Sequence, residues 1–135
     1  MTKEGKKQFL RQYQAARRRE SLILEEIEQL RSRKTSPVGL GDGMPHGSGL
    51  SDLSEYAARL DELLRELEAE REKQLQAYQQ IREQIMKVPN QIEQDVLARR
   101  YLLGQSWEKI SVEINYDYRY VLKIHGKALL HFEIA

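Results

Sequence analysis

The strongest constraint on the fold of this chain is a sixteen-residue segment that no helix can cross. Residues 35–50, TSPVGLGDGMPHGSGL, hold five of the eight glycines and two of the three prolines in the 135-residue chain. In a helix interior, glycine costs about 1 kcal/mol and proline about 3 kcal/mol relative to alanine. On both sides of this segment, apolar residues recur at steps of three and four, which is typical of amphipathic helices. We therefore expect a flexible loop over 35–50 that joins two separate long helices.

Both predicted long helices carry one apolar stripe. The first, in region 1–34, runs from about Thr2 to Lys34 and is interrupted at Glu20; its stripe is Phe9, Tyr13, Ala16, Ile23, Ile27 and Leu30. The second, 51–88, starts near Ser51 or Asp52, where Asp52 and Glu55 have capping-box spacing, and ends before Pro89. Its stripe weakens at Glu70 and Gln74 and comprises Leu53, Tyr56, Leu60, Leu63, Leu67, Ile81, Ile85 and Val88.

The charges of the two helices favour a coiled-coil-like antiparallel hairpin. Residues 1–34 have a net charge of +5 and residues 51–88 a net charge of −3. A pair of long one-sided helices cannot bury both stripes fully, so we expect further packing against the C-terminal domain or a second copy, that is, a homo-oligomer through the long helices. The basic run Arg17–Arg19, with Lys3, Lys6, Lys7 and Arg11 before it, could touch nucleic acid. We interpret it instead as a flank that complements the acidic helix.

Residues 89–135 have the pattern of a three-helix domain. Asn90, with Glu93 three residues later, predicts the start of a helix over 91–103, and Gly104 is typical of its end. The expected buried face of that helix is Ile92, Val96, Leu97 and Tyr101. Two more helices follow, over 107–114 and 118–132. The fold class is therefore all-α: a long helical hairpin followed by a trihelical helix-turn-helix domain.

The last two helices have the local signals of a helix-turn-helix. Ser106 can cap the first of them, in which Trp107, Ile110 and Ile114 share one face. Ser111 is small, as is needed where two helices cross closely. Asn115 tolerates the positive φ that the turn requires. Asp117 is a good N-cap for the second helix.

That second helix divides into an apolar and a basic side. At about 100° per residue, Val121, Ile124, Ala128 and Phe132 fall within roughly 80° of one another. Arg119, Lys123 and Lys127 cluster on the opposite side. In a helix-turn-helix, the outward face of this helix enters the major groove, where cations meet phosphates and guanine edges. An ordinary solvated face is the alternative interpretation. The first turn of the 107–114 helix, at Ser106 and Trp107, would meet the DNA backbone, because helix N-termini favour anions.

From Val96 to Leu130 the chain resembles region 4 of bacterial sigma factors, which reads promoter DNA. Ser106-Trp107 matches the start of the family's scaffold helix, Asp117 its recognition-helix cap, and Lys127-Ala128-Leu129 the end of its motif. By that resemblance Tyr118, Arg119, Leu122 and Lys123 occupy base-facing positions. Tyr118 and Leu122 replace basic residues of the family, so we do not expect its standard promoter element as the target.

The whole chain is similar to small phage and prophage proteins of Gram-positive bacteria. The shared features are a helical N-terminal half, a stretch like Met44-Pro45-His46-Gly47 and a tail like Tyr118-Arg119-Tyr120-Val121. These proteins are grouped with RinA-type and ArpU-type late-gene transcription regulators. The resemblance implies a regulator that binds double-stranded DNA, with RNA polymerase as a possible second partner.

Two other functions remain open. A small terminase subunit would also bind DNA, at a packaging site. An adaptor would bind RNA polymerase without reading DNA, and the zero net charge of residues 89–135 favours that interpretation, since many DNA-binding domains are positive.

Other classes of function have little support in the sequence. There is no cysteine, and His46, His125 and His131 lack the spacing of a metal site, so we expect no metal and no cofactor. The GLGDG stretch at 39–43 has no preceding strand and no following Lys-Ser or Lys-Thr, so we interpret it as linker rather than nucleotide loop. Nothing resembles an activated nucleophile, which indicates a non-enzyme. No apolar run is long enough for a membrane span, and we expect a cytoplasmic protein.

Overall fold

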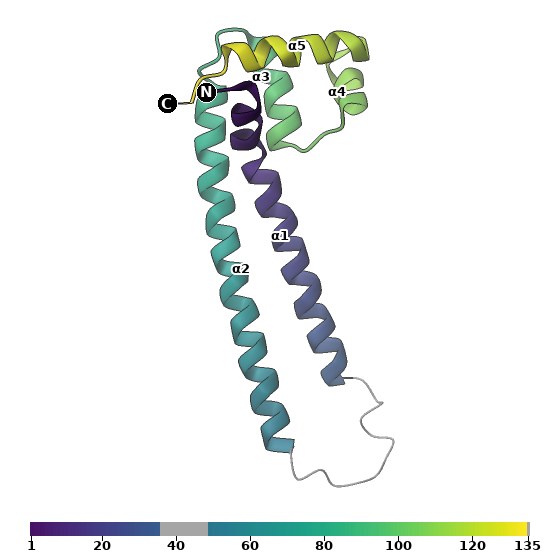
Figure 1. The fold of residues 1–135 in the computed structure, drawn as a ribbon. Helices are drawn as coiled ribbons and strands as arrows, with labels where there is room; N and C mark the ends of the chain where they lie inside the picture. The colour runs from purple at the N-terminus through teal and green to yellow at the C-terminus, as the bar shows by residue number, and fades with distance from the viewer. Residues whose placement is uncertain (36–48, 135) are drawn as a thin grey trace. The chain divides into compact units, whose positions relative to one another are not determined.

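The computed structural model describes residues 1–35 and 49–134, and every regular element in them is a helix (Figure 1). In chain order these are α1 (Lys3–Thr35), α2 (Gly49–Ile85), α3 (Gln91–Leu97), the π-helix η2 (Ala98–Leu102), α4 (Trp107–Ile114) and α5 (Tyr118–His131). The predicted fold class is confirmed: a long α1–α2 hairpin precedes short C-terminal helices that pack together. The loop predicted over 35–50 lies outside the described residues, except that Thr35, Gly49 and Leu50 are helical.

The chain forms two compact units, and both long helices contribute to each of them. One unit, here called the terminal unit, contains residues 1–17 and 73–135. The other, the hairpin unit, contains residues 18–72. The three C-terminal helices therefore share their unit with the first turns of α1 and the last turns of α2.

The hairpin unit is held by the two apolar stripes. Its core is Ile23, Ile27, Leu63 and Leu67, with Leu30 and Leu60 packed beside it, as predicted. The two glutamates that interrupt the stripes form ion pairs from one helix to the other. Arg19 lies 3.1 Å from Glu70, and Arg71 lies 2.9 Å from Glu20. Thus Arg19 complements the acidic helix as predicted.

Three expectations for α2 were wrong in detail. Leu53 is 50% exposed and does not belong to the core. The helix begins at Gly49, so that Asp52 lies in its first turn and not at its N-cap. The helix ends at Ile85, before the predicted 88, although Val88 is still buried against the terminal unit's core.

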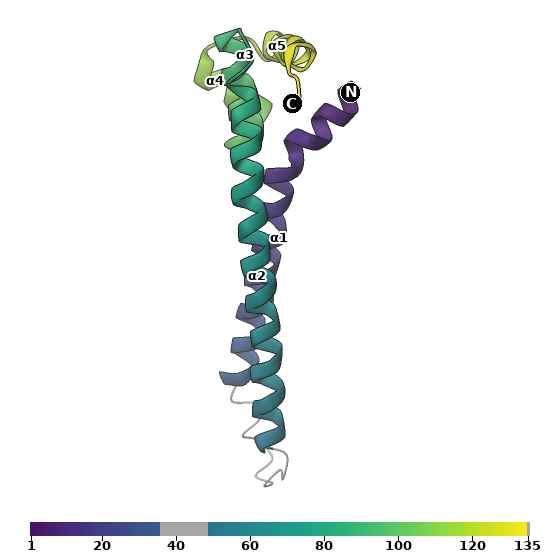
Figure 2. The same cartoon turned by 90° about the vertical axis from the view of Figure 1, so that its left-hand side faces the viewer.

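The core of the terminal unit combines α1, α2 and the C-terminal helices. Leu10, which the periodicity of α1 did not single out, is fully buried there. The first turns of α1 leave α2 and run toward α5 (Figure 2), so a different side of the helix is covered. The rings of Phe9 and Phe132 lie 6.1 Å apart. The buried members of this core are Leu10, Ala77, Ile81, Ile85, Val88, Leu97, Tyr101, Leu102, Ala128, Leu129 and Phe132.

Two side chains of α1 also satisfy carbonyl groups at the ends of C-terminal helices. Lys6 Nζ donates to the Leu129 carbonyl oxygen at 2.8 Å. Gln14 Nε2 donates to the carbonyl oxygens of Tyr101 and Leu102 at 3.2 and 3.3 Å. The last carbonyls of a helix lack partners within the helix. The start of α1 therefore caps both η2 and α5. Packing of the hairpin against the C-terminal domain was one of the two arrangements that we expected.

The helix predicted over 91–103 is present, but its second half is a π-helix. Asn90 Oδ1 accepts from the backbone N–H groups of Ile92 and Glu93, as predicted for a cap. The Glu93 carboxylate, however, is buried and lies 2.8 Å from His131 Nδ1. Ile92 is 40% exposed, so its predicted burial was wrong, whereas that of Val96, Leu97 and Tyr101 is confirmed.

Gly104 ends this helix with a φ of +68°, as expected for a C′ glycine. A Cβ there would also lie 3.1 Å from the Gln14 amide that caps η2. Gly104→Ala should therefore destabilise the protein by about 1–2 kcal/mol in urea unfolding. Gly126→Ala is the control, since Gly126 is helical and its Cβ would meet only the Lys3 ammonium, at an ordinary contact distance of 3.9 Å, so alanine should stabilise by up to about 1 kcal/mol. Equal stability of the Gly104 variant and the wild type would contradict this account.

Candidate nucleic-acid interface

The segment from Ser106 to Asp117 forms the predicted helix, turn and second cap. Ser106 Oγ accepts from Lys109 N at 3.1 Å, and Asp117 Oδ2 accepts from Arg119 N at 3.1 Å. Asn115 ends α4 in the left-handed region, with φ 58° and ψ 46°. These three predictions are confirmed.

Ser111 has a role that its size alone did not indicate. Its hydroxyl donates to the Tyr116 carbonyl oxygen at 2.6 Å, and its own carbonyl accepts from Tyr116 N at 3.1 Å. The two hydrogen bonds close the turn around Asn115. Because the turn is fixed by backbone and side-chain bonds together, the start of α5 has a defined direction relative to α4.

The apolar side of α5 is buried as predicted. Val121 and Ile124 form a small core with Val96 of α3 and Ile110 of α4, and Trp107 and Ile114 pack at its edge. Ala128 and Phe132 are buried in the larger core of the terminal unit. The helix ends at His131, one residue before the prediction, and Phe132 is its extended C-cap.

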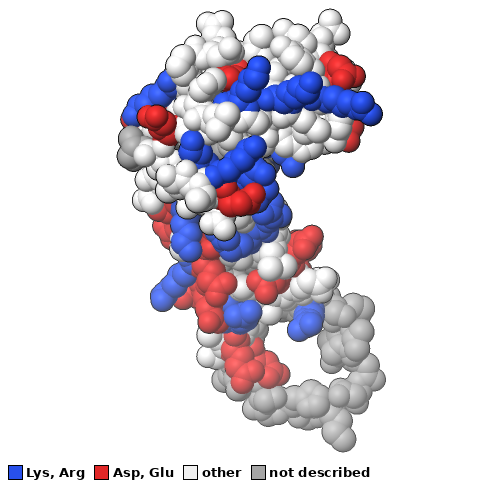
Figure 3. Space-filling view, turned by 45° about the horizontal axis from the view of Figure 1, so that its top comes forward, with Lys and Arg blue, Asp and Glu red and all other residues white. Residues whose placement is uncertain are grey.

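The basic side of α5 is exposed along its whole length. The side chains of Arg119, Lys123 and Lys127 are all accessible. Figure 3 shows Lys and Arg side chains in a row where α5 lies. Within the described part of the chain, none of these three side chains forms an ion pair or a hydrogen bond. The stripe is therefore free to bind an anionic ligand without breaking an internal contact.

Aromatic and apolar side chains flank the start of this stripe. Tyr118 and Leu122, both predicted to face DNA bases, are exposed. Sequence reasoning did not select Tyr116 and Tyr120, which are exposed too and whose rings lie 5.2 Å apart. Their spacing of four residues across the turn was the available signal. Together these residues give the N-terminal end of α5 a surface that can make apolar and hydroxyl contacts.

His125 lies in the interior of the domain, and Trp107 packs at the edge of its small core. The Tyr101 hydroxyl and His125 Nε2 share a hydrogen bond of 2.7 Å, and the Trp107 ring lies 4.6 Å from the imidazole. Burial, with the nearby cations of Lys7 and Arg100, lowers the pKa of His125 from 6.5 to about 4. His125 is therefore a packed neutral residue and does not contact phosphate.

The indole of Trp107 also has a cationic neighbour. The Arg100 guanidinium lies over this ring, 4.3 Å from its centre. Burial also raises the pKa of the neighbouring Tyr101 hydroxyl. A DNA contact at the start of α4 would therefore use exposed Ser106 and backbone N–H groups rather than the Trp107 ring.

The terminal unit as a whole is far more positively charged than residues 89–135 alone. Residues 89–135 alone are neutral. The compact unit to which they belong has fourteen Lys and Arg against eight Asp and Glu, a net charge of +6. The hairpin unit has eight against thirteen, a net charge of −5. The folded unit that presents α5 is thus strongly basic because α1 and α2 supply the excess.

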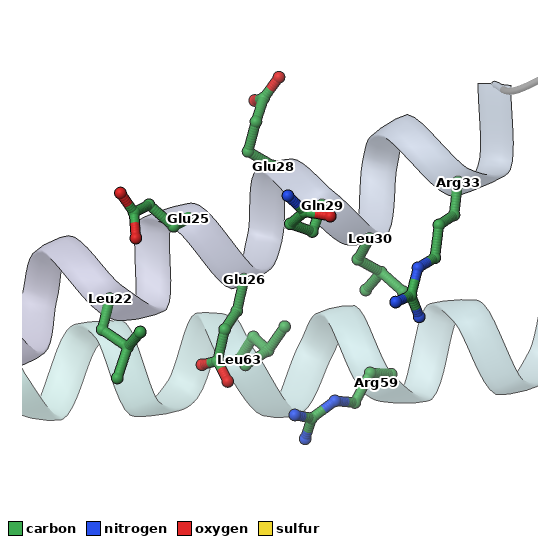
Figure 4. Close-up of a pocket in the computed structure, with 9 residues that line it drawn as sticks. All are labelled: Leu22, Glu25, Glu26, Glu28, Gln29, Leu30, Arg33, Arg59 and Leu63. Atoms are coloured by element: carbon green, nitrogen blue, oxygen red, sulfur yellow. The ribbon is translucent and has the colours of Figure 1, made fainter.

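A hollow lies between α1 and α2 in the hairpin unit (Figure 4). Its volume is about 650 Å³, and it is an open groove lined by Leu22, Glu25, Glu26, Glu28, Gln29, Leu30, Arg33, Arg59 and Leu63. The Arg59 guanidinium forms an ion pair with Glu62 at 2.9 Å, which raises its pKa. The groove contains neither a histidine nor a hydroxyl group that could act as a nucleophile.

Residues 1–35 and 49–134 contain no cluster of three or more side chains suited to hold a metal ion. They also contain no helix long and apolar enough to cross a membrane.

Comparisons with models of protein families, with curated proteins and with solved structures gave no match to this chain.

Proposed function

We propose that the protein is a sequence-specific regulator of transcription that binds double-stranded DNA through α5. The outward face of α5 lies in the major groove, with its N-terminal end toward the bases. Arg119 and Lys123 reach base edges, Tyr118 and Leu122 contact bases or sugars, and Lys127 binds a phosphate. Ser106 and the first backbone N–H groups of α4 meet the DNA backbone.

The observation that carries this proposal is the exposed and unpaired stripe of Arg119, Lys123 and Lys127 on a helix whose opposite side is locked in a core. A rigid helix can enter the major groove, which is wide enough to admit it. The net charge of +6 on the terminal unit supports the same function, because phosphate neutralisation supplies much of the affinity for DNA. That charge also removes the reason to prefer an adaptor that does not touch DNA.

The biological context follows from the resemblance to sigma region 4 and to phage regulators. We propose a phage-type regulator that acts at a promoter or operator, with the hairpin unit available for self-association or for RNA polymerase. A small terminase subunit is the alternative among DNA-binding functions. A ring-shaped assembly in light scattering would favour packaging, whereas a dimer on a promoter fragment would favour regulation.

The test begins with selection of bound sequences from a random duplex library. With the selected site, Arg119→Ala should weaken binding by about 1–3 kcal/mol and relax the preference at one position. Lys127→Ala should weaken binding to all DNA sequences to a similar degree. Binding can be measured by fluorescence anisotropy over a salt titration.

Arg65→Ala is a matched control, because it removes an exposed cation from the hairpin unit. It should bind like the wild type. Failure of the library to yield any bound sequence, or wild-type binding by both α5 variants, would refute the proposed interface. Capture of RNA polymerase without any salt-dependent DNA binding would assign the adaptor function instead.

A further inference from the structure

We propose that the first turns of α1 form a second DNA-contacting element, in which Lys3, Lys7 and Arg11 bind phosphates beside the groove that α5 occupies. This inference rests on the proposed function and extends its interface to residues more than a hundred positions away in the chain. It also revises the interpretation of these cations as a flank that complements the acidic helix α2.

The three residues lie on one face of α1, because side chains four positions apart are neighbours on a helix. This part of α1 belongs to the terminal unit and runs toward α5 (Figure 2). The position of α1 is fixed at two points: Leu10 is fully buried and Lys6 donates to the Leu129 carbonyl oxygen. The cationic face is therefore held in place rather than carried on a loose terminus.

Lys3 of α1 lies close to the outward side of α5. A Cβ built on Gly126 would lie 3.9 Å from Lys3 Nζ. At about 100° per residue, Gly126 lies roughly 20° from Arg119 and 60° from Lys123 around α5. Lys3 therefore borders the face of α5 that carries the basic stripe.

The electrostatics of His125 give independent support. The positive charges of Lys7, Lys3 and Arg11, with that of Arg100 from η2, all act to lower the pKa of this histidine in α5. Four cations from two other elements are thus close enough to α5 to influence one buried group. Such a concentration of like charge favours binding of an anion that neutralises it.

Lys3 and Arg11 are the free members of this group. Both are exposed, and neither forms an ion pair within residues 1–35 and 49–134. Lys7 makes one contact, an ion pair of 3.5 Å with the largely exposed Glu4. An exposed pair of this kind contributes little and is readily exchanged for a phosphate. Lys6 is excluded, because its ammonium already donates to a carbonyl of α5.

Phosphate is the ligand that fits these residues. A helix beside the recognition helix meets the sugar-phosphate backbone and not the base edges, as contacts outside the groove position a protein on the duplex. Duplex DNA carries one negative charge per roughly 1.7 Å of its axis, so several cations along one helix face can be neutralised together.

The experiment compares Lys3→Gln/Arg11→Gln with a control that loses the same charge, Arg33→Gln/Arg65→Gln in the hairpin unit. The probe is the duplex selected for the wild type. The plot of log Kobs against log salt should lose about 2 units of slope in the α1 variant, and affinity at 0.15 M salt should fall about 30-fold. The control should keep the slope and affinity of the wild type. All exchanged side chains are exposed, so unfolding midpoints should stay unchanged.

The outcomes separate this inference from the proposed function. An unchanged slope in the α1 variant, while Arg119→Ala weakens binding, overturns the inference and leaves α5 as the interface; the cations would then serve another acidic ligand. An equal loss in both double variants also overturns it, since net charge alone would be responsible. No salt-dependent binding by the wild type overturns the proposed function and this inference together.

Discussion

Removal of residues 1–17 should unfold the terminal unit, including the helix-turn-helix, instead of only shortening the hairpin. These residues supply fully buried Leu10, the Phe9 ring against Phe132, and the side chains that cap η2 and α5. Loss of one buried leucine side chain typically costs about 2–5 kcal/mol. A whole domain is commonly stable by only about 5–15 kcal/mol. The 18–135 fragment should therefore show no cooperative unfolding transition for its C-terminal helices, measured by circular dichroism and amide exchange.

The point variant Leu10→Ala tests the same contact in the full chain. It should lower the free energy of unfolding by about 2–5 kcal/mol. Leu22→Ala is the matched control in the same helix, because Leu22 is 58% exposed and should change stability by less than about 0.5 kcal/mol. A fragment of residues 89–135 that folds cooperatively and binds DNA like the full chain would contradict the prediction that the C-terminal helices need residues 1–17.

The stability of the protein should fall as the pH is lowered from about 6.5 to about 4, because of His125. In the folded state its pKa is lowered to about 4, chiefly by burial, from an ordinary value of 6.5. Below 6.5 the unfolded chain binds a proton that the folded protein does not yet accept, so acid favours unfolding. The contribution of His125 to stability is complete above pH 6.5, its pKa in the unfolded chain. It is lost as the pH falls toward about 4, its pKa in the folded protein. Its size is about 3 kcal/mol, at 1.36 kcal/mol per pH unit.

His125→Leu removes this proton-binding group while filling most of the same space. The variant loses the Tyr101 hydrogen bond and should be less stable than the wild type near pH 7.5. From pH 6.5 to pH 4, the unfolding free energy of the wild type should then fall by about 3 kcal/mol relative to that of the variant. Urea titrations at several pH values measure it. Parallel pH profiles for the two proteins would show that His125 is not responsible.

The parts of the fold that could be predicted are those governed by neighbours in the sequence. The caps at Ser106, Asn90 and Asp117 bond to N–H groups two or three residues away. The positive φ of Asn115 and Gly104 is likewise a property of single turns. For the same reason the helical spacing correctly placed the basic and apolar sides of α5.

The parts that could not be predicted depend on which distant segments meet. Periodicity marks a stripe, but it does not say which element covers each turn, so Leu10 was missed and Leu53 was assigned to the core. The spacing of Glu93 from Asn90 predicts a capping box. In the structure the Glu93 carboxylate lies beside His131, 38 residues later. The position of the α1 cations near α5 is another contact between distant segments. Residues 89–135 are neutral by themselves, and the positive charge of the terminal unit appears only when α1 and α2 are included.

The hydrogen bond from Lys6 to the Leu129 carbonyl joins residues 123 positions apart, and this separation bears on how the protein is made. The opening turns of α1 leave the ribosome long before α5, the helix that covers them, has been synthesised. Until then Leu10 and Phe9 have no partner, and closure of so long a loop is entropically costly and slow. A nascent chain that lacks α5 would thus lack a finished terminal unit, so this unit can complete its core only after α5 has been synthesised.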